Sequence, residues 1–241
     1  MIYFGGDSFM YGQPIKDAGG HDSFDRKYAV PQRVQKLLNT PVCDDAQVSS
    51  SNKLIYLRAL TNILSDESCD YYVIMWSRGV DRRLEHIMDY DLKERWINII
   101  PCANHEKDDK IRNDINKLVL KHLVTDESSF LNNLIYMVSL QEILKKYNKR
   151  YIFCYAHNEF LELYKRYQYG FELGVKDDIE DFTKITNLKP LVDSLDSKNI
   201  LSKSFTEFVN VENPNIHPNR HECKEFTMYL LEEIKDEIKR R

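Results

Sequence analysis

The chain has 241 residues, 42% of them hydrophobic, which is enough to bury a sizeable core in one domain. Its 34 Lys and Arg side chains nearly balance 38 Asp and Glu side chains, so the formal net charge of −4 gives no general case for nucleic-acid binding. No apolar run approaches the length of a membrane span and no leader-like segment is evident, so we expect a cytoplasmic protein without membrane contact.

The cysteines and histidines predict neither disulfides nor a metal centre. The five cysteines are widely spaced and never form a CxxC pair, which is typical of reduced thiols: Cys43, Cys69, Cys102, Cys154 and Cys223. His217 and His221 lie four residues apart, but no second ligand pair follows at zinc-site spacing. We therefore expect no metal and no cofactor. The sequence leaves the oligomeric state open.

Short apolar runs alternate with helical patterns along the chain. Runs rich in β-branched or aromatic residues occupy residues 2–4, 42–43, 71–76 and 151–155. Apolar residues at helical spacing predict helices over residues 27–38, 52–64, 109–122, 130–147 and 218–239. Strands that alternate with helices favour an α/β fold with a parallel sheet buried on both faces.

Two polar stretches interrupt this alternation. The stretch between the third strand and residue 130 is long and charged, and we expect a helical insertion at about residues 80–125 that covers one edge of the sheet. Residues 171–204 are also polar and are expected to form a flap or short helices. No repeat or linker divides the chain, so residues 1–241 are interpreted as a single domain.

The tripeptide Gly6-Asp7-Ser8 directly follows the first predicted strand. Ligands of open parallel sheets bind beyond the carboxyl ends of the strands, where Ser8 falls. A serine there becomes a nucleophile when a histidine takes its proton. His217 is the best placed, because it lies in the stiff loop NPNIHPN just before the last helix. The remaining candidates are expected to have ordinary surface roles: His21, His86, His105, His122 and His157.

A plain structural alternative accompanies this interpretation. Asp7 and Ser8 would then cap the segment that follows them, and His217 would cap the final helix.

The Gly6-Asp7-Ser8 and His217-Pro218 blocks resemble the first and last blocks of the SGNH or GDSL hydrolases. The opening GDSFMYG is similar to the versions encoded by tailed bacteriophages, which implies the host cytoplasm. The run Ser49-Ser50-Ser51-Asn52 resembles the second block, and Trp76-Ser77-Arg78 resembles the end of the third strand. The resemblance implies a three-layer α/β/α sandwich with a mostly parallel, flavodoxin-like sheet.

The resemblance also implies roles for individual residues. Ser8 would be the nucleophile, His217 the base, and Asp7 the anchor of the nucleophile turn. Backbone amides near Ser8 and Ser49 would hold the oxyanion, with side-chain donors drawn from Asn52, Ser77 and Arg78.

Three departures from the family pattern stand out. Ser49 occupies the position of a glycine, and the third block lacks its asparagine. Pro214 stands where the last block has its acid, so Asn215 or a backbone carbonyl would have to orient the imidazole of His217.

Taken together, these features predict a serine esterase or acyl hydrolase that cleaves small acyl esters, for example acetyl esters on carbohydrate, through a Ser8-His217 acyl-enzyme. Its partner would be a small-molecule ester. A first alternative is a weakly active or inactive protein of this type that binds a ligand or a host protein. A second is a transferase that passes the acyl group to an alcohol.

Overall fold

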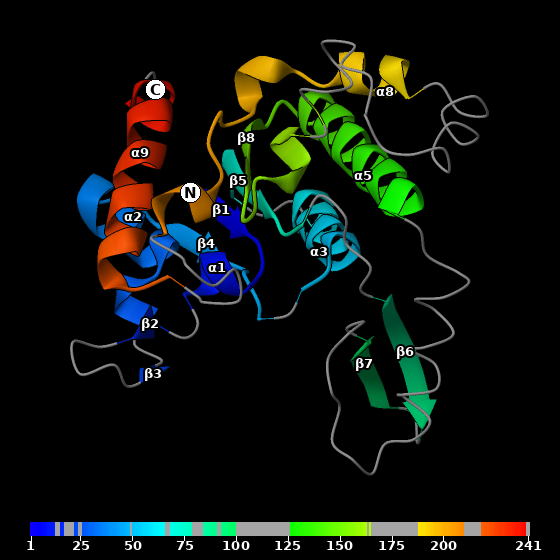
Figure 1. The fold of residues 1–241 in the computed structure, drawn as a ribbon. Helices are drawn as coiled ribbons and strands as arrows, with labels where there is room; N and C mark the ends of the chain where they lie inside the picture. Colours follow the sequence, from blue (N-terminus) through cyan, green and yellow to red (C-terminus); the bar gives the residue numbers. More distant parts are fainter. Residues whose placement is uncertain are drawn as a thin grey trace.

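The protein is built around four parallel strands that form a sheet in the order β4-β1-β5-β8 (Figure 1). The structure is a computed structural model, and it describes residues 1–12, 15–16, 22–23, 26–48, 50–65, 68–78, 84–90, 93–99, 126–162, 164, 188–209 and 218–239. The strands are β1 (Ile2–Gly5), β4 (Val42–Asp44), β5 (Tyr71–Trp76) and β8 (Arg150–Tyr155). All four were predicted to within two residues.

The strand order is that of the flavodoxin-like sheets. In chain order these strands are numbers two, one, three and four across the sheet. A parallel bridge between Phe153 and Ile200 continues the sheet at the position of a fifth strand, and the Leu201 amide donates to the Phe153 carbonyl at 2.9 Å. The predicted parallel α/β sheet is therefore confirmed.

Helices cover both faces of the sheet, which makes three layers. Figure 1 shows α2 (Val30–Leu38) and α9 (Arg220–Lys239) on one side, and α3 (Asn52–Leu64) and α5 (Asp126–Lys146) on the other. Alternate residues of β5 enter the two apolar cores, with Val73 facing the α2 and α9 side and Ile74 facing the α3 and α5 side. Because both faces are covered, every position of β1 and β5 is buried.

Short elements complete the described fold. Four of them lie between β1 and α2 along the chain: α1 (Ser8–Tyr11), β2 (Ile15–Lys16), β3 (Asp22–Ser23) and the 3₁₀ turn η1 (Arg26–Tyr28). Three follow residue 187: α8 (Lys189–Ser194), η2 (Ser197–Asn199) and η3 (Phe205–Phe208). Of these, α8 and η2 confirm short helices within the polar stretch 171–204, and η3 follows directly after it. Residues 171 to 187 lie outside the described residues.

The predicted helical insertion at about residues 80–125 is wrong over its first part. Strands β6 (Leu84–Tyr90) and β7 (Lys93–Ile99) form an antiparallel hairpin, which Figure 1 shows apart from the central layers. The apolar residues of β6 are compatible with a helix as well as with a strand. Leu84, Ile87 and Met88 have helical spacing, whereas the strand register pairs Ile87 with Trp96 of β7. The predicted helix 109–122 lies outside the described residues.

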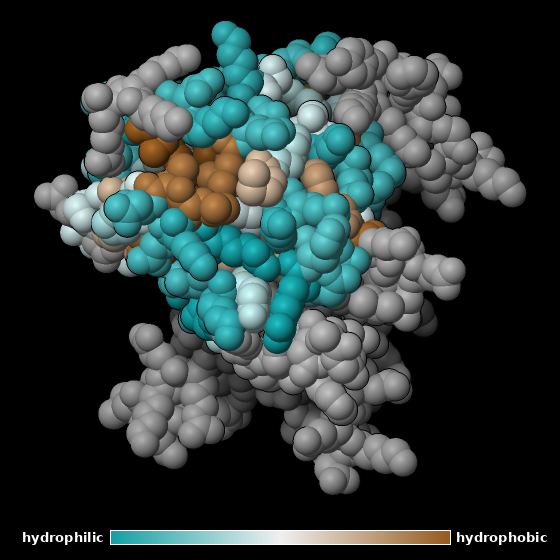
Figure 2. Space-filling view, turned by 90° about the vertical axis from the view of Figure 1, so that its left-hand side faces the viewer, coloured by the Kyte–Doolittle hydropathy of each residue, from teal (hydrophilic) through white to brown (hydrophobic). Residues whose placement is uncertain are grey.

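The surface of the α2 and α9 side is mostly hydrophilic. Figure 2 shows one apolar patch within it, and Leu37 on α2 and Met228 on α9 are large apolar side chains that are exposed. None of the helices that the structure describes combines the length and the hydropathy of a membrane span. Of the predicted reduced cysteines, Cys43, Cys69, Cys154 and Cys223 are free thiols, and Cys102 lies outside the described residues.

Candidate active site

The turn after β1 is built for close packing and carries Ser8 to the sheet edge. Gly6 has no room for a side chain, because a Cβ there would lie 2.7 Å from the Met10 Cβ and 3.1 Å from the Met75 Cβ. Gly12 ends α1 with a φ of 78°, a left-handed conformation that glycine adopts without strain. The two glycines therefore allow a sharp strand-to-helix turn, and Ser8 is the first residue of α1, half-buried.

Asp7 holds this turn, as the sequence predicted. One carboxylate oxygen accepts a hydrogen bond from the Phe9 amide at 3.0 Å, which caps α1. The other accepts one from the Ser77 hydroxyl at 2.5 Å, and the Asp7 side chain is buried. Both oxygens are thus used in positioning, and Asp7 ties the end of β1 to the end of β5.

Asn52 fixes the loop that follows β5. Its amide oxygen accepts a hydrogen bond from the Ser77 amide at 2.7 Å, and its amide nitrogen donates to the Arg78 carbonyl at 2.8 Å. Asn133 from α5 donates to the same carbonyl at 3.0 Å. Both donors of Ser77 are therefore engaged inside the protein, and the Arg78 side chain is exposed. The predicted oxyanion roles of Asn52, Ser77 and Arg78 stay predictions. The geometry adds a positioning role for Asn52 and Ser77.

The second predicted block lies beside the turn. The Gln47 amide donates to the Gly6 carbonyl at 3.0 Å, which joins the loop after β4 to the turn that carries Ser8. Ser51 caps α3 by accepting from the Leu54 amide at 3.1 Å. The Ser50 hydroxyl is buried and has no hydrogen-bond partner among the described residues. Ser49 lies outside them.

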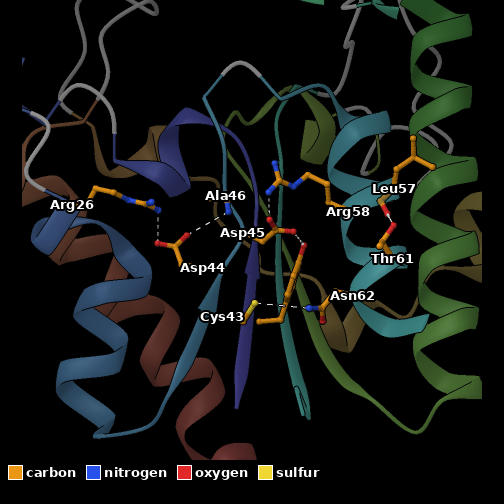
Figure 3. Close-up of polar contacts among 10 residues, drawn as sticks. Arg26, Cys43, Asp44, Asp45, Ala46, Leu57, Arg58, Thr61 and Asn62 are labelled. Atoms are coloured by element: carbon orange, nitrogen blue, oxygen red, sulfur yellow. Dashed lines mark hydrogen bonds and ion pairs between the residues drawn. The ribbon is translucent and has the colours of Figure 1, made fainter. Parts of the chain in front are cut away.

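Asp44 at the end of β4 and Asp45 just after it each bind an arginine. Figure 3 shows Asp44 reaching the Arg26 guanidinium and Asp45 reaching Arg58, and the Tyr3 hydroxyl also donates to Asp45 at 2.8 Å. Burial raises the pKa of Asp44, although the Arg26 charge counteracts part of this effect. Both carboxylates therefore have a structural role, because they hold neighbouring side chains in place.

His157 packs beside the turn that carries Ser8. It follows β8, is half-buried, and sets its ring edge-on against Phe9, with ring centroids 5.0 Å apart. Its predicted surface role stays a prediction, to which the structure adds this packing contact with Phe9. The available signal was its place: His157 comes two residues after a predicted parallel strand, at the same sheet edge as Ser8.

The segment before the His217 loop reaches this edge, and the segment after the loop packs on η1. Phe205 in η3 packs on Phe9 with ring centroids 5.6 Å apart, and the Thr206 amide donates to the Ala156 carbonyl at 3.0 Å. After the loop, the Arg220 guanidinium lies 4.2 Å from the Tyr28 ring of η1. His217 and Asn215 themselves lie outside the described residues.

The last helix begins with a capping box formed by two residues that follow the His217 loop. Asn219 accepts hydrogen bonds from the His221 and Glu222 amides at 2.8 and 3.1 Å, and Glu222 accepts one from the Asn219 amide at 2.7 Å. This reciprocal pair is a capping box that starts α9. Asn219 therefore holds the N-cap position of α9, and the alternative role of His217 as a cap stays a prediction on a residue outside the described ones. The alternative cap by Asp7 is present in α1.

Comparisons with known proteins give likenesses of fold only. No protein-family model and no curated protein matches the chain. Solved structures similar to it include a protein assigned to the lipolytic G-D-S-L family from Desulfitobacterium hafniense, at 13% identity and a TM-score of 0.45, covering 96% of this chain and 98% of that one.

Two esterases are also similar. One is a carbohydrate esterase family 2 enzyme with a carbohydrate-binding domain from Corynascus thermopiles (Myceliophthora fergusii), at 12% identity and a TM-score of 0.41, covering 97% of this chain and 66% of that one. The other is an acetyl xylan esterase from Butyrivibrio proteoclasticus, at 11% identity and a TM-score of 0.46, covering 98% and 63%. The chain spans about two thirds of these two esterases. The reaction of this chain is therefore argued from its own residues.

Proposed function

We propose that the protein is a serine esterase or acyl hydrolase that acts on small acyl esters, such as acetyl esters on carbohydrate. The observation that carries this proposal is the turn after β1, which presents Ser8 at the carboxyl edge of the parallel sheet while Asp7 holds it from below. The resemblance of the Gly6-Asp7-Ser8 and His217-Pro218 blocks to the SGNH hydrolases supports the same reaction.

In the proposed mechanism the Ser8 hydroxyl attacks the ester carbonyl while His217 accepts its proton. His217 then gives this proton to the leaving alcohol, and water attacks the acyl-enzyme in the second half of the reaction. The flanking contacts of η3 at the sheet edge and of Arg220 with Tyr28 support His217 as the base. Asn215 is proposed to orient the imidazole.

The oxyanion is assigned to backbone amides. The first N–H groups of a helix have no partner inside that helix, which suits the amide of Ser8. The amide of Ser49 or Ser50 in the neighbouring loop is the proposed second donor. Ser77 contributes indirectly, because its hydroxyl holds Asp7.

A second candidate function is ligand or host-protein binding without turnover. It is favoured by one observation. Ser77, at the position of the third block, donates its amide to Asn52 and its hydroxyl to Asp7, so both of its donors are used inside the protein. An oxyanion hole without that side-chain donor loses about a hundred- to a thousandfold in rate.

Hydrolysis of p-nitrophenyl acetate and labelling by a fluorophosphonate probe separate the two candidates. We expect wild type to hydrolyse the ester and to be labelled at Ser8, and Ser8→Ala to do neither. His217→Gln is expected to lose about a hundred- to ten-thousandfold in rate. Ser65→Ala, at the far end of α3, is the matched control and is expected to retain full activity. Wild type without hydrolysis or Ser8 labelling would leave the binding function.

A further inference from the structure

Two arginines that are far apart in the sequence meet at one tyrosine ring beside the site. The guanidinium carbon of Arg220, at the start of α9, lies 4.2 Å from the centroid of the Tyr28 ring. That of Arg33, on α2, lies 5.4 Å from the same centroid. The Arg33 Nη2 also donates to the Arg220 carbonyl at 2.9 Å, so the two residues form one cluster.

The charges of this pair have no counter-ion among the described residues. Within the described part of the chain, the Arg33 guanidinium donates only to the carbonyls of Tyr28 and Arg220, and the Arg220 Nη1 donates to the Tyr28 hydroxyl at 3.5 Å. The nearby Arg26 differs, because Asp44 neutralises it, as Figure 3 shows. Two unneutralised cations in half-buried positions create a positive potential that attracts an anion.

One donor of the cluster is also unused. The Nε of Arg220 is buried and has no hydrogen-bond partner in the described structure. A buried N–H without an acceptor is unfavourable, and native proteins seldom leave one unmatched. Nε and a terminal nitrogen of a guanidinium together match the two oxygens of a carboxylate or phosphate.

The cluster adjoins the helix that carries Ser8. Tyr11 ends α1, and the Arg26 guanidinium carbon lies 4.1 Å from its ring centroid. Arg26 and Tyr28 belong to the same 3₁₀ turn, and Pro218, the residue after His217, lies two residues before Arg220. The cluster is therefore placed to contact the part of a ligand that extends beyond the reacting ester.

We propose that Arg33 and Arg220, seated on Tyr28, form an anion-binding subsite for a carboxylate or phosphate group carried by the ester substrate. The assignment of the anion to the substrate rests on the proposed esterase function, whereas binding of the anion itself does not.

Direct binding tests the subsite without catalysis. Galacturonate and inorganic phosphate are titrated into the full chain by calorimetry at constant ionic strength, with galactose as the neutral control. We expect one of the anions to bind wild type, and the preferred one identifies the group. Arg220→Gln is expected to weaken this binding about tenfold or more, and Arg220→Lys, which keeps the charge without the fork, by less.

The matched control is Lys235→Gln, which removes an equal charge from the exposed face of α9 several turns away. Equal loss in Arg220→Gln and Lys235→Gln would reduce the effect to general charge and overturn the subsite. Absence of anion binding to wild type at tens of millimolar would do the same. Thermal unfolding of each variant checks that the fold is retained.

An activity measurement assigns the anion to the substrate. An acetylated oligosaccharide that carries the preferred anion is compared with its neutral counterpart, and Arg220→Gln is expected to lower kcat/KM about tenfold for the charged one only. If Arg220→Gln loses more anion binding than Lys235→Gln but wild type hydrolyses neither substrate, the subsite stands and the esterase function is excluded. Hydrolysis with equal kcat/KM losses, or none, on both substrates would remove the anion from the substrate.

Discussion

The hydroxyl of Ser77 donates a 2.5 Å hydrogen bond to the buried carboxylate of Asp7, and this contact joins the ends of the two central strands beneath Ser8. The turn that carries Ser8 is thereby supported from β1 and from β5. Because Asn52 fixes the Ser77 amide at 2.7 Å, the support extends to the start of α3. The position of Ser8 therefore depends on side chains from β5 and α3 as well as on its own turn.

Replacing Asp7 with alanine is expected to destabilise the protein by about 2–4 kcal/mol. The change removes the cap of α1 and leaves the buried Ser77 hydroxyl without its acceptor. Urea unfolding measures the loss, and Glu232→Ala on the exposed face of α9 serves as the control, with an expected change within about 0.5 kcal/mol. A loss for Asp7→Ala no larger than that of the control would contradict the positioning role.

Replacing Gly6 with alanine is expected to cost about 1–3 kcal/mol, because the new methyl group overlaps the Met10 Cβ and crowds the Met75 Cβ. The two neighbours are a short helix and a buried strand, and neither gives way without moving Ser8. Ester hydrolysis should therefore fall more steeply than stability in this variant. Urea unfolding and p-nitrophenyl acetate turnover, measured on one preparation, check both expectations. Turnover at the level of wild type would show that Ser8 does not depend on this packing.

The central fold could be predicted because its signals are local. The run at residues 71–76 is apolar at every position, which is typical of a strand covered on both faces. The helix predicted for residues 52–64 has the observed bounds of α3, because Ser51 supplies a cap and an apolar stripe follows. Neither inference needed knowledge of the rest of the chain.

The hairpin and the site network depend on information that local patterns lack. In β6, the residues Leu84, Ile87 and Met88 fit a helical stripe, and only pairing with β7 selects the strand. The Ser77-Asp7 contact joins residues 70 positions apart, so no spacing rule could reveal it. His157 was open to prediction from the carboxyl-end rule, but its polar neighbours favoured a surface interpretation.

Replacing Asn52 with alanine is expected to destabilise the protein by about 1–3 kcal/mol and to reduce ester hydrolysis. The substitution leaves the buried Ser77 amide without an acceptor and removes one of the two side-chain donors to the Arg78 carbonyl. Asn133→Ala removes only the other donor, so we expect it to affect hydrolysis less. Unfolding by urea and kcat for p-nitrophenyl acetate distinguish the variants. Equal kcat values in both would argue against Asn52 as the residue that fixes this loop.

Alkaline pH is expected to destabilise the protein through its buried thiols. Burial raises the pKa of the Cys223 thiol to about 12 and also raises that of Cys154. In the unfolded chain a thiol ionises near pH 8.5, so its contribution is complete below that pH and is lost as pH rises towards the folded pKa. Each such thiol should lower the free energy of unfolding by up to about 1.4 kcal/mol per pH unit above roughly pH 9.

Urea unfolding between pH 7 and pH 10.5, with a reductant present, measures this dependence. Cys223→Ala is expected to be less stable than wild type at pH 7, because it leaves a cavity in the α2 and α9 core. Its stability should nevertheless fall less steeply with pH, since one of the ionising thiols is gone. Parallel curves for the two proteins would mean that Cys223 ionises equally in the folded and unfolded states, against the effect of its burial.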